Sequence, residues 1–169
     1  ELGRLLAAAE GSARDTAVLN LMARAGLRVS EVTALQVADV ELNGRSGWLI
    51  IRSGKGNKTR RVPLNSEARQ ALQAWLEERP QAQTQAVFLS RSGRPLSERD
   101  VQRMVAEYAR TAGVDASPHT LRHTFATRAV EKGVDIATLQ ALLGHSRLET
   151  TGRYLHPTAG RMQEAVEGL

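Results

Sequence analysis

The sequence predicts a mainly helical α+β domain that contains one small antiparallel β-hairpin or sheet. Apolar residues recur at helical spacing in most segments of the 169-residue chain. Strand character is confined to two short runs, 48–52 and 61–64, which a turn rich in Gly and Asn separates. At this length, residues 1–169 are most simply one domain with a hydrophobic core of its own.

Composition narrows the classes of function. The formal net charge of +5 and the sequence pI of about 10.4 favour nucleic acid as a partner. On charge alone, a basic domain without an anionic ligand remains an equal alternative. The chain has no cysteine, which excludes disulfides and thiolate metal sites and fits a cytoplasmic protein. No run approaches the roughly 18 apolar residues of a membrane span.

In the first half of the chain, two helices precede the strands. The first helix carries the apolar stripe Val18, Leu21, Met22 and Ala25. Gly26 is expected to end this helix, and Ser30 to cap the next one. Pro63 lies in the second strand, which must therefore be an edge strand because proline has no N–H to donate.

In the second half, helices are predicted wherever a good N-cap residue precedes an apolar stripe. These N-caps are Asn65, Ser97, Ser117 and Asp135. The expected ends of their helices are Pro80, Gly113, Gly133 and Gly144. Ser146 and Glu149 have capping-box spacing for a further helix that holds Tyr154. A last amphipathic segment carries Met162, Ala165, Val166 and Leu169.

Two segments of the first half carry candidate functional side chains. Arg28 follows the first helix and could point into a cleft or into solvent, and Glu31 could orient it or simply face water. Residues 52–61 include five basic side chains and no acid, which predicts either a phosphate-backbone contact or a solvated turn. The candidates for backbone contact are Arg52, Lys58, Arg60 and Arg61. Lys55 lies between glycines and can release a proton, which suits a general acid.

The second half contributes histidines and an arginine. His119 and Arg122 lie at the start of the helix capped by Ser117, where free N–H groups already favour a phosphate. His119 and His123 have i, i+4 spacing, but no carboxylate lies between them and no third metal ligand is evident. A zinc site is therefore the weaker interpretation, and His123 is expected to be structural. His145 follows a glycine helix end and by itself could be only a capping group.

The chain has two tyrosines, and their surroundings differ. Tyr108 lies on the apolar stripe of its own predicted helix, so it is expected in the core. Tyr154 follows Arg153 and lies off the face that Leu148 and Leu155 share. We interpret Tyr154 as a phenol kept accessible for chemistry.

Together these segments resemble the tyrosine recombinase, or phage integrase, family. The matching segments are Ala-Gly-Leu-Arg-Val-Ser-Glu-Val at 25–32, the turn around Lys55, His-Thr-Leu-Arg-His-Thr-Phe-Ala-Thr at 119–127, and Leu-Gly-His-Ser-Arg-Leu-Glu-Thr-Thr-Gly-Arg-Tyr at 143–154. They fill all six positions of the family's active-site pattern, in order. The resemblance implies the fold of the family's catalytic domain over residues 1–169, without the helical DNA-binding domain that usually precedes it.

The resemblance also implies an activity: site-specific DNA recombination by strand cleavage and rejoining, without metal or cofactor. The implied catalytic set is Arg28, Lys55, His119, Arg122, His145 and Tyr154. Tyr154 would attack the scissile phosphate and form a 3′-phosphotyrosyl link, while the two arginines hold its oxygens. His119 would assist removal of the phenol proton, Lys55 would protonate the leaving 5′ oxygen, and His145 would hydrogen-bond the phosphate. Glu31 would support Arg28.

The implied partner is double-stranded DNA, bound by a homotetramer on paired sites, with the C-terminal segment docked on a neighbouring protomer or packed in cis. Three alternatives remain: a topoisomerase-like nicking and closing enzyme, a catalytically silent DNA-binding module, and a metal-dependent nuclease. The complete six-residue set disfavours the silent module. The shortage of carboxylates near the histidines disfavours the nuclease.

Overall fold

The computed structural model describes residues 1–52 and 59–144, and it confirms a mainly helical fold with a small antiparallel sheet. Several predicted features lie outside the described residues: Lys55, Lys58, His145, Tyr154, the helix after Ser146 and the C-terminal amphipathic segment. No helix of the described part is long and apolar enough to cross a membrane.

The chain begins with three α-helices, α1 (Leu2–Ala8), α2 (Ala13–Arg24) and α3 (Val29–Ala34), and a 3-10 helix, η1 (Val37–Asp39). Helix α2 is the centre of the fold, since residues 17–23 are all buried. As predicted, it ends just before Gly26, whose φ of 69° lies in the left-handed region that glycine adopts without strain.

Helix α3 starts two residues earlier than the sequence indicates. Its N-cap is Arg28, and Ser30 lies inside the helix, so the prediction of Ser30 as the N-cap is wrong. The physical reason is Glu31, which accepts a hydrogen bond from the backbone N–H of Arg28 at 2.9 Å. A side chain at the third helical position thus caps the helix from within.

The sheet contains β1 (Val40–Leu42), β2 (Gly47–Arg52) and β3 (Thr59–Pro63), antiparallel and in the order β1-β2-β3. β2 and β3 form the predicted hairpin, and Pro63 lies in an edge strand as expected. The short strand β1 was not predicted.

The register of the hairpin sets the direction of its side chains. Leu49 pairs with Val62, and Ile51 pairs with Arg60. Leu49, Ile51 and Val62 are buried, so this face of the sheet packs on the core. Arg60 belongs to the same face, because side chains two residues apart on a strand point the same way.

Four helices complete the described chain: α4 (Ser66–Glu78), α5 (Glu98–Ala112), α6 (Pro118–Glu131) and α7 (Ile136–Leu143). All four predicted N-caps are confirmed, since Asn65, Ser97, Ser117 and Asp135 each accept a backbone N–H three residues on. Gly113 and Gly144 end α5 and α7 in the left-handed conformation, also as predicted.

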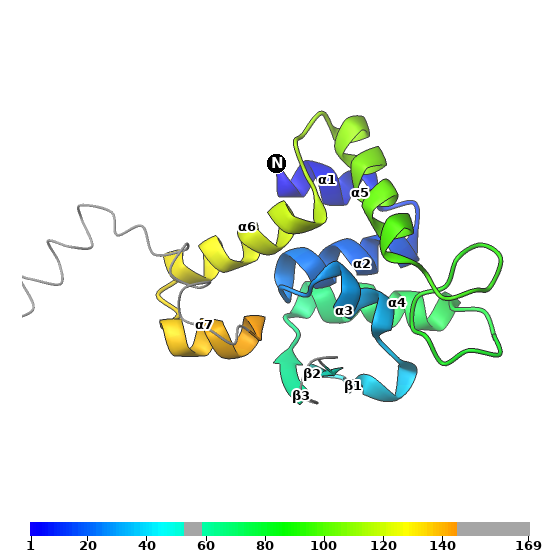
Figure 1. Cartoon of the computed structure of the whole chain (residues 1–169), viewed down its shortest axis with the longest axis horizontal. Coiled ribbons are helices and arrows are strands. Elements are labelled where there is room, and N and C mark those ends of the chain that lie inside the picture. Colours follow the sequence, from blue (N-terminus) through cyan, green and yellow to red (C-terminus); the bar gives the residue numbers. More distant parts are fainter. Residues whose placement is uncertain (53–58, 145–169) are drawn as a thin grey trace, which may run out of the picture.

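In Figure 1, α2 lies in the middle of the molecule, with the sheet at one end, α1 and α5 at the other, and α6 with α7 on one side. Helix α2 packs against α4 and α6, while α7 packs against α6 and β3. The main core gathers around α2. A smaller buried cluster of Ala126, Leu139 and Leu143 joins α6 to α7.

Candidate functional site

A cluster of charged side chains lies beyond the C-terminal end of α2, with Glu31 at its centre. Arg60 of β3 contacts this carboxylate in a bidentate manner, with Nη1 2.7 Å from Oε1 and Nη2 3.0 Å from Oε2. Nη1 of Arg28 lies 3.0 Å from Oε1, and Nη1 of Arg122 lies 3.9 Å from Oε2. The structure therefore brings Arg28, Glu31 and Arg122 together, as expected, and adds Arg60 to them.

Arg28 is held at both its backbone and its side chain by Glu31. Its side chain is nevertheless 40% exposed. Glu31 itself is only 9% exposed. Glu31 thus fixes the backbone and one guanidinium nitrogen of Arg28, while the rest of the guanidinium faces solvent. An arginine held in this way can bind a phosphate.

Arg122 is buried on the inner side of α6, and backbone carbonyl groups orient its guanidinium. Nη1 donates to the carbonyl oxygen of Gly26, and Nη2 donates to that of Leu143 at 2.7 Å. Gly26 can approach so closely because it has no side chain: a Cβ there would lie 2.4 Å from the ring of Phe125. The end of α2 and the end of α7 are therefore both tied to Arg122.

Arg60, a candidate for contact with the DNA backbone, lies mostly inside the protein, where its side chain is only 15% exposed. Besides its two contacts with Glu31, its Nε donates to the carbonyl oxygen of Leu142 at 2.9 Å. The period-two alternation of β3 already contained this signal, since Arg60 shares the face of the buried Val62. In the described contacts, Arg60 is thus the buried ion-pair partner of Glu31.

The electrostatics of the cluster favour an anion. Burial raises the pKa of Glu31, but hydrogen bonds from the Arg60 side chain and the Arg28 backbone outweigh this and bring the pKa below its ordinary value of 4.5. Glu31 is therefore a carboxylate at neutral pH. Three guanidinium groups surround this one carboxylate, so the cluster has an excess of positive charge. Such fixed, partly desolvated cations stabilise charge that develops on a phosphate.

The histidines of α6 lie in its first two turns. His119 is exposed and precedes Arg122 by one turn, as the sequence predicts. His123 is exposed too. In residues 1–52 and 59–144, no group of three or more His, Cys, Asp or Glu side chains is placed to hold a metal ion.

Two other candidates for DNA contact lie on the outer side of the sheet. Arg52 is 66% exposed and pairs with the buried carboxylate of Asp39 at 2.9 Å. Arg61 is 56% exposed, pairs with Glu41, and lies 4.8 Å from the ring centre of Trp48. Both arginines are exposed to solvent, and an acidic partner neutralises part of the charge of each.

Tyr108 is confirmed as a packing residue, although its hydroxyl is also hydrogen-bonded. The ring packs against the main core, and the hydroxyl donates to Asp15 at 2.9 Å. Burial and this hydrogen bond raise the pKa of Tyr108 to about 12. Asp15 lies near the start of α2 and Arg24 at its end, about 14 Å apart along the helix axis. Tyr108 is therefore remote from the Glu31 cluster and hard to deprotonate.

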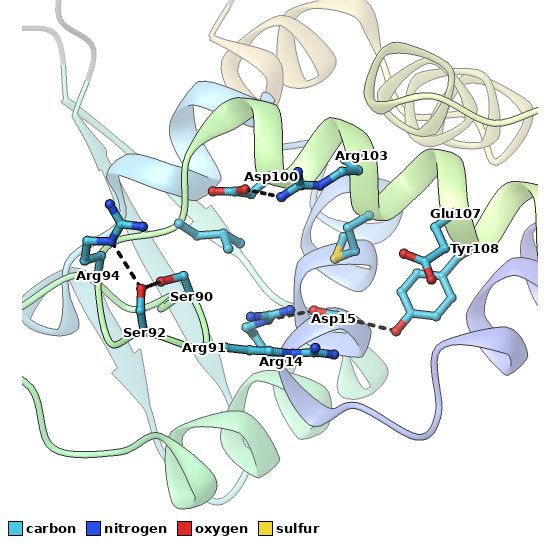
Figure 2. A pocket seen from close by; sticks show the side chains of 12 residues that line it. Arg14, Asp15, Ser90, Arg91, Ser92, Arg94, Asp100, Arg103, Glu107 and Tyr108 are labelled. Carbon is cyan, nitrogen blue, oxygen red and sulfur yellow. Dashed lines mark hydrogen bonds and ion pairs between the residues drawn. The ribbon is translucent and has the colours of Figure 1, made fainter.

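A separate cavity of about 500 Å³ lies beside Tyr108, between the start of α2, helix α5 and the loop before it (Figure 2). Arginines and acids line it together: Arg14, Arg91, Arg94, Arg103, Asp15, Asp100 and Glu107. Two of these arginines form ion pairs within the lining, Arg14 with Asp15 and Arg103 with Asp100, each at 2.7 Å. No residue of the Glu31 cluster lines this cavity, so it is distinct from the candidate site.

Comparisons with known proteins identify the family. Residues 1–161 match the model of the phage integrase family. Tyrosine recombinase XerC of Chlamydia caviae is 44% identical over 149 residues, which cover 85% of this chain and 47% of that protein. Tyrosine recombinase XerA of Pyrococcus furiosus is 39% identical over 156 residues, or 91% of this chain and 54% of that protein. The chain thus spans about half the length of these curated relatives.

Solved structures show the same fold. A crystal structure of XerA recombinase superimposes with a TM-score of 0.84 at 30% identity, covering 99% of this chain and 62% of that one. XerH site-specific recombinase, bound to its difH substrate before cleavage, also gives a TM-score of 0.84, at 28% identity over 99% of this chain and 52% of that one. By its sequence and its fold, the chain belongs to the phage integrase family.

Proposed function

We propose that residues 1–169 form the catalytic domain of a site-specific DNA recombinase that cleaves and rejoins strands through a 3′-phosphotyrosyl intermediate. The observation that carries the proposal is the convergence of Arg28 and Arg122 on Glu31, which builds a fixed cationic cradle from α3 and α6. Relatives named tyrosine recombinase support the activity.

In the proposed step, the Tyr154 oxygen bonds to phosphorus while the bond from phosphorus to the 5′ oxygen breaks. Arg28 and Arg122 hold the non-bridging oxygens and stabilise the extra charge of the transition state. The surroundings of Tyr108 support Tyr154 as the nucleophile. Of the two tyrosines in the chain, Tyr108 keeps its proton and donates a hydrogen bond to Asp15, far from the Glu31 cluster.

Proton transfer completes the step. His119, one turn before Arg122, takes the phenol proton, and Lys55 gives a proton to the leaving 5′ oxygen. His145, which comes directly after Gly144, hydrogen-bonds the phosphate. The position of Leu143 supports this role, because its carbonyl group already contacts Arg122.

The proposed partner is double-stranded DNA, and the proposed assembly is a homotetramer on two paired sites in the cytoplasm. The DNA partner is supported by XerH, which is solved with its difH substrate both before and after cleavage. Exposed Arg52 and Arg61, together with Lys58, are the proposed contacts to the DNA backbone.

The test is covalent capture of DNA. The chain is incubated with a pool of nicked duplexes of randomised sequence in the presence of a chelator, and protein that stays linked to DNA after denaturation is isolated. We expect an adduct with the wild-type chain and with Tyr108→Phe, the matched tyrosine control, but none with Tyr154→Phe. An adduct in Tyr154→Phe would refute the assigned nucleophile, and cleavage that requires a metal would refute the mechanism.

The captured duplex then separates recombination from simple nicking and closing. Two copies of the selected site on one plasmid should be exchanged, with a change in the order of the flanking DNA. Relaxation of supercoiled plasmid without exchange would contradict the recombinase proposal and favour the topoisomerase-like alternative.

A further inference from the structure

We infer that Arg60 is a positioning residue: by joining Glu31 to the last turn of α7, it holds Arg28 and Arg122 in place to bind the phosphate. The inference rests on the proposed function and adds to it an internal arginine. Arg60 does not touch DNA in this scheme. It acts through the groups that orient Arg28 and Arg122.

The guanidinium of Arg60 makes three hydrogen bonds. Nη1 and Nη2 of Arg60 hold the two oxygens of Glu31, and Nε holds the carbonyl oxygen of Leu142. Three donors of a rigid, planar group therefore reach two elements that are distant in sequence. This arrangement fixes the distance between α3 and α7, because the donor directions of a guanidinium do not vary independently.

The two elements that Arg60 joins each orient another arginine. Glu31 orients Arg28 through its backbone and its side chain. The last turn of α7 orients Arg122, because the carbonyl oxygen of Leu143 accepts from Nη2 of Arg122 at 2.7 Å. Arg60 and Arg122 thus bind consecutive carbonyl groups at the end of α7, which no helical N–H satisfies and where cations are favoured.

The guanidinium of Arg60 fits closely against the end of α7. A Cβ at Gly144 would lie 2.6 Å from Nη1 of Arg60, so a side chain at this left-handed residue would displace the guanidinium. On the other side, Arg60 pairs in the sheet with the buried Ile51. The side chain is enclosed by β2, α3 and α7, which is more than an incidental surface ion pair requires.

Loss of Arg60 should therefore slow cleavage without weakening DNA binding. Glu31 would lose its bidentate partner and could move toward Arg122, now 3.9 Å away. The end of α7 would lose one of its two guanidinium contacts. Removal of a group that orients a functional side chain typically lowers activity about 10–100-fold.

The experiment measures two quantities on the captured nicked duplex: the single-turnover rate of adduct formation at saturating protein, and the dissociation constant from fluorescence anisotropy. Arg60→Ala should lower the rate about 10–100-fold and leave the dissociation constant unchanged. Arg60→Lys keeps the charge but cannot bridge both partners, so it should be intermediate. Added guanidinium ion should restore part of the rate in Arg60→Ala only.

Two other arginines provide comparisons. Arg24 is also partly buried and joins α2 to Glu67 of α4 at 3.2 Å, and it is not among the described partners of Glu31. Arg24→Ala should therefore leave the rate near that of the wild type. Arg61 lies on the outer side of β3, the strand that also carries Arg60. Arg61→Ala should instead weaken DNA binding and lower the slope of log Kd against log salt by about 1.

A double-mutant cycle shows whether Arg60 acts through Glu31. In a Glu31→Gln background, Arg60→Ala should add little to the loss of rate, since both changes break the same link. A rate in folded Arg60→Ala equal to that of the wild type, or losses that multiply in the double variant, would overturn the inference. If Arg60→Ala does not fold, a normal rate in Arg60→Lys overturns it and a reduced rate at unchanged affinity supports it.

The same assay separates the two proposals. An absence of any Tyr154-dependent adduct in the wild type refutes the proposed function. A wild-type adduct that forms equally fast in Arg60→Ala refutes only the positioning role.

Discussion

The Glu31→Gln variant tests whether the arginine cluster depends on one buried carboxylate. Glu31 is 9% exposed, and Arg60 donates to both of its oxygens. Glutamine keeps one acceptor oxygen but removes the charge, which leaves three guanidinium groups close together. Hydrogen bonds to a charged group contribute about 1.5–3 kcal/mol each, and breaking a buried ion pair costs about 3–5 kcal/mol. We expect a loss of about 3 kcal/mol at pH 7.

The stability difference between wild type and Glu31→Gln should depend on pH. The pKa of Glu31 is lowered in the folded state, so its contribution to stability is present above the ordinary value of 4.5 and is lost as the pH falls through the folded value. The difference in stability between wild type and Glu31→Gln should therefore be full near neutral pH. It should shrink steadily below pH 4.5.

The assay is urea unfolding followed by circular dichroism at a series of pH values, with thermal unfolding at pH 7 as a second measure. For a protein of this size, 3 kcal/mol corresponds to a fall in Tm of roughly 6–12 °C. The control is Glu41→Gln, because Glu41 is 47% exposed and pairs with the exposed Arg61. It should cost less than about 1 kcal/mol. Equal stability of Glu31→Gln and wild type at pH 7, or a difference that persists unchanged to pH 3, would refute the reasoning.

Two further predictions concern the packing at Gly26 and the hydroxyl of Tyr108. Gly26→Ala should lose about 2–4 kcal/mol in urea unfolding, since it combines a left-handed residue with a Cβ 2.4 Å from Phe125. Gly113→Ala, equally left-handed but with nothing within 4 Å, should lose only about 1–2 kcal/mol; similar losses at both sites would contradict the crowding at Gly26. Tyr108, with its pKa raised to about 12, adds stability that is complete below pH 10 and is lost as the pH rises toward 12. Tyr108→Phe should abolish the ultraviolet tyrosinate transition near pH 12, and persistence of that transition in the variant would show that it does not belong to Tyr108.

Local signals were readable from the sequence. Asn65, Ser97, Ser117 and Asp135 each cap a helix by contacting an N–H three residues away, so the whole interaction lies within one short window. Such contacts depend little on the rest of the fold. The strand β1 was missed for the opposite reason: three residues are too few to show an alternating pattern, and they form a strand only because β2 lies beside them.

The site itself could be read only in part. The motifs singled out Arg28, Glu31 and Arg122, and the structure places these side chains together although Arg122 comes from a different helix. The internal contacts of Arg60 could not be foreseen because its acidic partner lies 29 residues earlier in the chain, outside the basic segment. The start of α3 was placed two residues too late because Ser30 is a good N-cap residue by itself. In the structure, Glu31 instead accepts a hydrogen bond from the backbone N–H of Arg28 and caps the helix there. In both cases one buried carboxylate overrode the local pattern.

The small cluster of Ala126, Leu139 and Leu143 has a consequence for local unfolding. Among the described residues, helix α7 contacts this cluster, β3 and the guanidinium groups of two arginines, whereas α2 is enclosed by the main core. Local opening of α7 should therefore require less free energy than global unfolding. We expect backbone amides of α7 to exchange with deuterium through a sub-global opening, and those of α2 only when the whole protein unfolds.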